Sequence, residues 1–439
     1  MKQKKSNFKI HISLVIYLFC FMFAPPILPI NFIIPLSIYS LFIMMRFYRK
    51  ELIYIIEKSK MKRFTILMSI YVLYLLLIII LNFSWGEKVN ISVYITSFYQ
   101  IFLITPIMLC CIIYIIIEYE KFNLTKDQLI VHFIWAGAIE AIISLCTFIS
   151  PSVRQICIDI MNRNLDTEIS DFILSVRVYG FANGLYDLFG WGTGIIAALP
   201  LFLSKDKQKK YMWFIPLLLV SPLLNARTGI VIFLLGFLIY LLFMDNKSVI
   251  FLFKKIFFIF VGICAVYLVI KWIQISNEKV YTWITKGIES FANTLSGGKE
   301  QKGTAMGNLF KESSWNIPSF PDIIFGTGHS VYVGRKYAKY SHSDVGYINY
   351  LWMGGIVGSC MLYGIYFVMF CRAIKQSLDK RINWLLIFLG GTIIVFNIKG
   401  QAFTHCPATA VILTILFCSI YDNVRRGENN EIYSDNTSL

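Results

Sequence analysis

The sequence predicts an all-α, polytopic membrane protein with about twelve transmembrane helices. Hydrophobic residues make up 57% of the 439 residues and charged residues only 15%, whereas a soluble chain carries about 25% charge. The apolar residues also form blocks of about 20 residues, the length that crosses the roughly 30 Å hydrocarbon core of a bilayer. These two observations exclude a soluble enzyme, a secreted disulfide scaffold and a disordered chain, and the continuous apolar runs exclude a β-barrel.

Twelve apolar blocks qualify as spans. We expect them near residues 10–25, 29–45, 64–82, 91–117, 129–149, 183–203, 211–224, 228–244, 256–274, 346–370, 383–400 and 406–421. The first begins with basic residues but has no small-residue cleavage site after it, so it predicts a span and not a signal peptide. The seventh is short and carries Pro216 and Pro222, which favours a broken helix.

The distribution of basic residues predicts the orientation in the membrane. With the N-terminus inside, the inner segments hold 26 Lys and Arg and the outer segments 14, of which eight lie in one long loop. Long loops translocate largely regardless of their charge. This bias and the even number of spans predict that both termini lie in the cytoplasm. The net charge of +16 then follows from topology and predicts no nucleic-acid partner.

Four regions follow from this reading. Residues 1–274 hold nine spans, 275–345 form an outer loop, 346–421 hold the last three spans, and 422–439 form a polar cytoplasmic tail. Loops as long as 275–345 are usually functional or disordered. Its stretch IPSFPDIIFGTGHS is too apolar for a disordered linker, so we expect it to pack over the outer mouth of the helices.

Four basic residues at the predicted outer face call for an explanation, namely Arg177, Arg227, Arg335 and Lys399. A charge deep in a span costs about 2.5–3.5 kcal/mol on insertion scales. One explanation is that each side chain reaches lipid phosphates at the interface. The other is an anion site, because guanidinium groups bind phosphate as a bidentate fork. The tight turn NARTG around Arg227 favours the anion site there.

His342 and Asp344 lie two residues apart just before the tenth span. Histidine is the usual general base near neutral pH, and a nearby carboxylate can orient it or act itself. The pair is therefore the candidate for catalysis. The structural alternative is that Ser343 or Asp344 caps the N-terminus of the tenth span. His329 and His405 are weaker candidates.

Two carboxylates fall within predicted spans, Glu140 in the fifth and Asp187 at the start of the sixth. Intramembrane carboxylates are functional hypotheses by default, and a structural polar contact between helices is the alternative. The sequence contains no D-x-D pair, no C-x-x-C, no H-E-x-x-H and no phosphate-binding G-x-x-x-x-G-K-[ST]. We therefore expect no protein-held metal, no cofactor and no nucleotide hydrolysis.

Several motifs occur in a definite order along the outer face. Arg-x-x-Gly (Arg177, Gly180) precedes one span, and Asn-Ala-Arg-Thr-Gly (225–229) opens another. After the long loop come Phe-Gly-Thr-Gly (325–328), His-Ser-Asp-x-Gly-Tyr (342–347) and Leu-Trp-Met-Gly-Gly-Ile-Val-Gly (351–358). In this order the chain resembles the O-antigen polymerase and ligase superfamily, specifically the Wzy-type polysaccharide polymerases. The resemblance covers about residues 177–360.

Two spacings bear on which branch of the superfamily the chain resembles. The Arg-x10-Gly pattern of the polymerases is matched by Arg335 and Gly346. In the His-[Asn/Ser/Gln]-x9-Gly pattern of the ligases, Met353 stands where the glycine would be, and Gly354 comes one place late. The departure favours a polymerase, with a ligase-type transferase as the alternative.

The resemblance implies a metal-independent glycosyltransferase with a multi-span fold similar to the GT-C class. It would polymerise oligosaccharide repeat units carried on undecaprenyl pyrophosphate into O-antigen or capsular polysaccharide. The chain would lie among the lipids of a bacterial inner (cytoplasmic) membrane. A chain-length regulator and a flippase would be its protein partners. His342 and Asp344 would be catalytic. The residues that would bind pyrophosphate or sugar are Arg177, Arg227, Arg335, Asp187, Tyr347 and Lys399.

Two other classes fit twelve spans. A flippase or other transporter should place its charges near mid-membrane between two repeats, but the polar clusters here gather on one face and no repeat is visible. A polytopic sensor or scaffold is the remaining reading. The lipid-linked sugars that accumulate in a deletion strain would separate the polymerase from the flippase.

Overall fold

All regular structure that the computed structural model describes is helical, and no strand occurs among the described residues. The described residues are 10–85, 94, 95, 99, 103–164, 177, 179–183, 186–243, 267, 268, 270–282, 285, 289, 312–330 and 343–436. The all-α class is therefore confirmed. Most of the predicted ninth span, part of the fourth (the greater part of 91–102) and the middle of the long loop lie outside these residues.

Among the described residues, four helices are long and apolar enough to cross a membrane. They are α4 (Met61–Trp85), α7 (Lys126–Ile149), α18 (Gly346–Gln376) and α20 (Pro407–Asn436), the last by its part Pro407–Val424. A helix rises 1.5 Å per residue, so about 20 residues cover the hydrocarbon core. Several long apolar helices mark the chain as a multi-pass membrane protein.

Shorter helices complete the bundle. Four of them are apolar: α1 (Ile12–Phe23), α2 (Ile33–Phe47), α10 (Asp187–Ala198), which runs on into η2 (Leu199–Phe202), and α13 (Thr228–Phe243). The others are α3 (Arg49–Lys58), η1 (Leu103–Met108), α6 (Leu109–Lys121), α8 (Pro151–Asn164), α11 (Lys205–Tyr211), η3 (Met212–Phe214), α12 (Ile215–Asn225), η4 (Glu312–Trp315), α17 (Asp322–Phe325) and α19 (Lys380–Phe396). The number of twelve spans stays a prediction.

The region of the predicted seventh span is divided, but the division lies ahead of its two prolines. Helix α11 passes through the short η3 into α12. Pro216 lies in the first turn of α12, where its missing N–H is tolerated, and Pro222 lies inside the helix. The α12 helix ends at Asn225, so the following turn brings Arg227 to the start of α13.

The predicted continuous span over 346–370 is wrong in one respect, because α18 breaks at Gly355. That residue has φ 63° and ψ −168°, outside the helical region. The rings of Tyr347 and Tyr363 stack with centroids 5.8 Å apart, although a straight helix would separate these residues by about 24 Å. The segment 346–354 therefore folds back against 356–376, and the latter is the part long enough to span.

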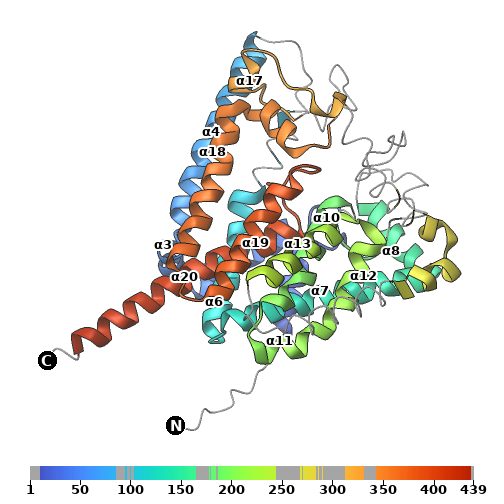
Figure 1. Cartoon of the computed structure of the whole chain (residues 1–439). Helices are drawn as coiled ribbons and strands as arrows, with labels where there is room; N and C mark the ends of the chain where they lie inside the picture. Colours follow the sequence, from blue (N-terminus) through green and yellow to red (C-terminus); the bar gives the residue numbers. More distant parts are fainter. Residues whose placement is uncertain are drawn as a thin grey trace, which may run out of the picture.

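The apolar end of the long loop packs on this break. The N–H groups of Thr327 and Gly328 donate to the carbonyls of Trp352 (2.6 Å) and Met353 (3.0 Å). The Tyr74 hydroxyl of α4 donates to the carbonyls of Phe325 and Gly354, at 2.8 and 3.1 Å. The described part of the loop therefore packs on α4 and on the break in α18, and these two helices run side by side in Figure 1. Its packing over the outer mouth of the helices stays a prediction.

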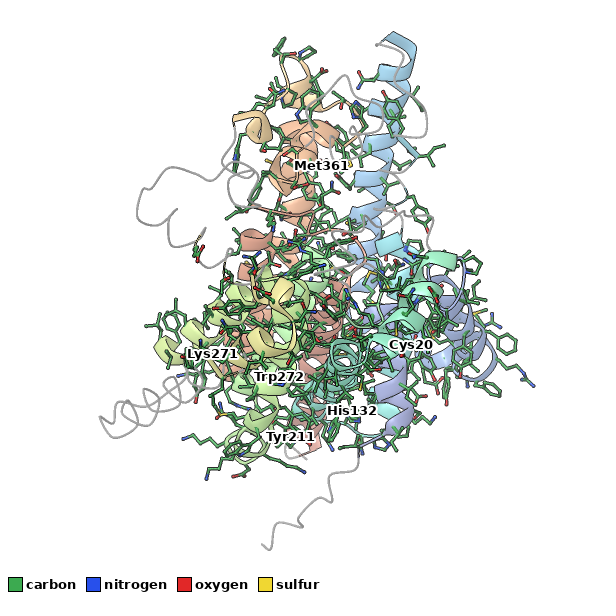
Figure 2. The ribbon with its side chains drawn as sticks, turned by 90° about the vertical axis from the view of Figure 1, so that its right-hand side faces the viewer. Cys20, His132, Tyr211, Lys271, Trp272 and Met361 are labelled. Carbon is green, nitrogen blue, oxygen red and sulfur yellow. The ribbon has the colours of Figure 1, made fainter. Side chains whose placement is uncertain are left out.

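The two ends of the bundle differ in their polar contacts. At one end, Arg381 pairs with Asp127 at 3.2 Å and Asp422 accepts a 2.9 Å hydrogen bond from the Tyr119 hydroxyl. This end carries α11 and lies toward both termini, and His132 and Tyr211 lie near it (Figures 1 and 2). The sequence predicts this end to be cytoplasmic. The other end carries the residues described next.

Candidate anion-binding site

An ion pair joins the start of α10 to the end of α19. The Lys399 Nζ lies 3.1 Å from Asp187 Oδ1, and the two side chains are only 19% and 28% exposed. Asp187 is the first residue of α10, and Lys399 follows the last turn of α19. The contact therefore brings together two of the predicted binding residues that are 212 positions apart in the chain.

Arg227 lies beside this pair, in the turn between α12 and α13. Burial lowers the pKa of its guanidinium to about 10, the charge of Arg177 acts in the same direction, and Asp187 acts in the opposite direction. The next residue, Thr228, donates from Oγ1 to the Asp187 carbonyl at 3.5 Å. Arg227 thus stays cationic at neutral pH in a half-buried place near a second arginine.

Close helix packing brings these residues together. Gly194 of α10 and Gly229 of α13 approach so closely that a Cβ on Gly194 would collide with the backbone of Gly229. Small residues permit such approaches between membrane helices. On the other side of α10, Trp191 stacks on Phe396 of α19 with ring centroids 4.5 Å apart and an interplanar angle of 8°. The N-terminal end of α10 therefore lies between the α12–α13 turn and the end of α19.

The segment that carries Arg177 is held by buried side chains of two helices. From α7, Thr147 Oγ1 accepts the Gly180 N–H at 2.9 Å and Glu140 Oε1 accepts the Phe181 N–H at 2.9 Å. From α12, the side-chain amide of Asn225 bonds to the backbone of Tyr179. Glu140 is therefore a structural support of the Arg-x-x-Gly motif, which was the alternative interpretation for this residue.

The sequence interpretation did not pick out this support. Glu140, Ser144 and Thr147 are fully buried and are spaced four and three residues apart on α7, so they form a polar stripe on one helical face. That periodicity in an otherwise apolar span was the available signal. Nothing in the sequence showed that the stripe would face the 179–181 backbone.

Tyr347 has a structural contact. Its N–H donates to the Asn397 carbonyl (3.2 Å), and its hydroxyl donates to the Ile394 carbonyl (2.7 Å). Gly346, the first residue of α18, packs directly on the Gly400 carbonyl. These contacts join the start of α18 to the turn that carries Lys399.

Asp344 is exposed and lies two residues before the contact between Gly346 and Gly400. The N-cap position of α18 is Val345, which has no capping side chain. Ser343 is buried, and its Oγ accepts the Val345 N–H at 3.1 Å just ahead of the helix. The alternative in which Asp344 occupies the capping position is therefore wrong.

Arg335 and His342 lie outside the described residues. The two weaker histidine candidates, His329 and His405, are both held in place. His405 Nε2 lies 3.2 Å from the Phe21 carbonyl at the end of α1, and burial lowers its pKa to about 4. His329 is buried between the rings of Tyr94 and Trp352, and burial lowers its pKa also. Both are neutral at pH 7.

A second polar contact was missed from sequence. Ser330 Oγ donates to Asn349 Oδ1 at 2.6 Å and accepts from Gln401 Nε2 at 2.9 Å. It joins the end of the long loop, the first turn of α18 and the segment after Lys399. Since serine, asparagine and glutamine are common in loops, their types carried no signal.

The chemistry of the cluster is that of an anion site. Among the described residues Arg177, Arg227 and Lys399 supply three positive charges against the single carboxylate of Asp187. An anion would balance the excess and would gain charge-assisted hydrogen bonds from two guanidinium groups. Among the same residues no three His, Cys, Asp or Glu side chains are grouped as metal ligands.

No protein-family model and no curated protein matches the sequence. A function for the protein therefore rests on the motifs, the charges and the contacts of this chain alone.

Proposed function

We propose that the protein is a polymerase of undecaprenyl-pyrophosphate-linked oligosaccharide repeat units, acting on the outer face of the bacterial cytoplasmic membrane. The observation that supports it most is the convergence of Arg177, Arg227 and Lys399 around Asp187. These are four of the residues that the sequence analysis predicts for binding. They come from three separate parts of the chain and meet at the end of the bundle that the charge bias predicts to be external.

In the proposed reaction the cation cluster binds the pyrophosphate of the donor. The bond between the anomeric carbon of the growing chain and the pyrophosphate oxygen breaks, and undecaprenyl pyrophosphate leaves. Charge that develops on this leaving group is stabilised by fixed cationic donors, which are worth most where water is excluded. The half-buried state of Arg227 and Lys399 supports this role.

The hydroxyl of the incoming unit attacks the same carbon and loses its proton. A base is needed for this step, and His342 and Asp344 are the proposed residues, one as base and the other orienting it or binding sugar. The support for Asp344 is its exposure close to the turn of Lys399. A single glycosidic bond forms for each bond broken, so the step needs no oxidant or reductant, and the resemblance implies a metal-independent transfer.

The proposal is tested by deleting the gene and analysing both the surface polysaccharide and the lipid-linked sugars. A polymerase predicts single repeat units on the lipid carrier at the outer face and no long chains. A flippase predicts lipid-linked units that stay at the inner face, and a ligase predicts long chains that stay on the carrier. Unchanged polysaccharide would contradict the proposal.

A further inference from the structure

Asn225 occupies an unusual place in the candidate site. It is the last residue of α12 and is fully buried. Its Oδ1 accepts the Tyr179 N–H at 3.1 Å, and its Nδ2 donates to the Tyr179 carbonyl at 2.6 Å and to the Ser221 carbonyl at 3.1 Å. The side chain therefore bonds to both the N–H and the carbonyl of Tyr179, as the backbone of a neighbouring β-strand would.

The position of this contact relates directly to the two arginines. Asn225 is two residues before Arg227, and Tyr179 is two residues after Arg177. The two guanidinium groups lie close enough for the charge of Arg177 to act on Arg227. Like charges repel, so a fixed contact between their two backbones is needed to keep them together while no anion is bound.

Both sides of the contact are anchored. The residues after Tyr179 are bonded to Thr147 and Glu140 of α7, and Asn225 belongs to α12, which packs on α7 and α10. Among the described residues, Asn225 is the side chain whose hydrogen bonds connect the Tyr179 backbone to the end of α12. A change at Asn225 would therefore loosen one arginine relative to the other without removing either.

We infer that Asn225 is a positioning residue that holds Arg177 and Arg227 as a pair, and that the pair makes the site select a diphosphate over a monophosphate. A diphosphate offers a separate phosphoryl group to each guanidinium fork, whereas a monophosphate fills one fork well. Preorganised donors bind more tightly because no ordering cost is paid on binding. The inference rests on the proposed function, since it concerns the same site.

The test measures the binding of inorganic pyrophosphate and inorganic phosphate to the full chain in lipid nanodiscs. The variants are Asn225→Ala and Asn225→Leu, the second of which keeps the branching and the number of side-chain heavy atoms of asparagine and so avoids a cavity. Ser221→Ala is the matched control, because it removes the 3.0 Å hydrogen bond from Ser221 Oγ to Ser144 one turn earlier and leaves the Tyr179 contact intact. Arg227→Ala serves as the site-loss variant.

We expect both Asn225 variants to raise the dissociation constant of pyrophosphate about tenfold, the scale of one lost charge-assisted contact, and that of phosphate less than about threefold. The Ser221 control should keep the wild-type ratio. Partial unfolding would lower the stoichiometry for both anions equally and leave the ratio unchanged. An unchanged ratio in Asn225→Leu overturns the inference alone. Failure of the wild type to bind pyrophosphate, or binding unaffected by Arg227→Ala, overturns the proposed site as well.

Discussion

Asp187 and Lys399 form an ion pair of 3.1 Å between two helix ends that meet only in the folded chain. Asp187 is the one carboxylate of the cluster among the described residues, and Lys399 neutralises it. The charges of Arg177 and Arg227 therefore remain in excess. The pair also joins α10 to the segment after α19, which in turn packs on the start of α18. Its energetic contribution and its effect on the anion site are both measurable.

A double-mutant cycle with Asp187→Asn and Lys399→Met should give a coupling free energy of about 1 kcal/mol in detergent unfolding, because the pair is mostly shielded from water. The pair of Lys121 and Glu118, at 3.2 Å, has a more exposed lysine (47%) beside a shielded carboxylate (10%); it is the control for exposure of the lysine and should give about 0.3 kcal/mol. A coupling equal to that of the control would show that shielding does not strengthen the Asp187 contact.

Replacing Arg227 tests its proposed contact with pyrophosphate. Hydrogen bonds to charged groups are worth about 1.5–3 kcal/mol, so Arg227→Ala should lower polymerisation at least about tenfold at matched expression. Arg227→Lys keeps the charge but loses the fork and should recover activity only partly. The measurement is the chain-length distribution of the surface polysaccharide, and normal lengths in both variants would remove Arg227 from the site.

Substitutions at His342 and Asp344 separate the two proposed roles. General-base catalysis contributes about 10²–10⁴-fold, so the base, for which His342 is favoured, should show a loss of that size on change to alanine. Asp344→Asn keeps the shape and hydrogen bonding while it removes the charge. Activity in Asp344→Asn but not in Asp344→Ala would mean that hydrogen bonding suffices. Wild-type polymer from His342→Ala would exclude it as the base.

The break in α18 makes a prediction about stability. Gly355 has a positive φ, and a Cβ there would meet the Ile324 carbonyl. Gly355→Ala should therefore destabilise the protein by about 1–3 kcal/mol. Gly364 lies in the same helix, and a Cβ added to it would have no neighbour within 4 Å, so Gly364→Ala should be neutral or stabilising by up to about 1 kcal/mol. The measurement is thermal unfolding in detergent. Equal effects of Gly355→Ala and Gly364→Ala would indicate that α18 is a straight helix.

His405 predicts a pH dependence. Its pKa is lowered to about 4 in the folded state, against an ordinary value near 6.5. Between these values the unfolded chain binds the extra proton and the folded chain does not, so stability should fall as pH decreases from about 6.5 to about 4. His405→Gln keeps a donor for the Phe21 carbonyl and should flatten this part of the unfolding profile. An unchanged slope would contradict the assignment.

Much of the site could be selected from sequence because charge is conspicuous in an apolar chain. Arg177, Arg227, Asp187 and Lys399 each stood out as a charge at or near a span end, and the structure brings them together. The same reasoning named Glu140 but not the roles of Asn225, Ser144 and Thr147, since neutral polar residues carry little cost in sequence terms. Their roles depend on which backbone groups they face after folding.

Local composition by itself determined that the chain is helical and crosses a membrane, because the bilayer imposes the length and polarity of each span on the sequence. It also favoured a broken seventh span, although the division lies at η3, ahead of both prolines, and Pro222 lies within α12. The reversal at Gly355 was decided only by tertiary structure. The sequence Trp-Met-Gly-Gly is compatible with a helix, and the turn exists because the backbone of 325–328 bonds to the carbonyls that the break exposes. The spacing of Arg177 and Arg227 was decided in the same way, by a contact between Asn225 and a backbone 46 residues away.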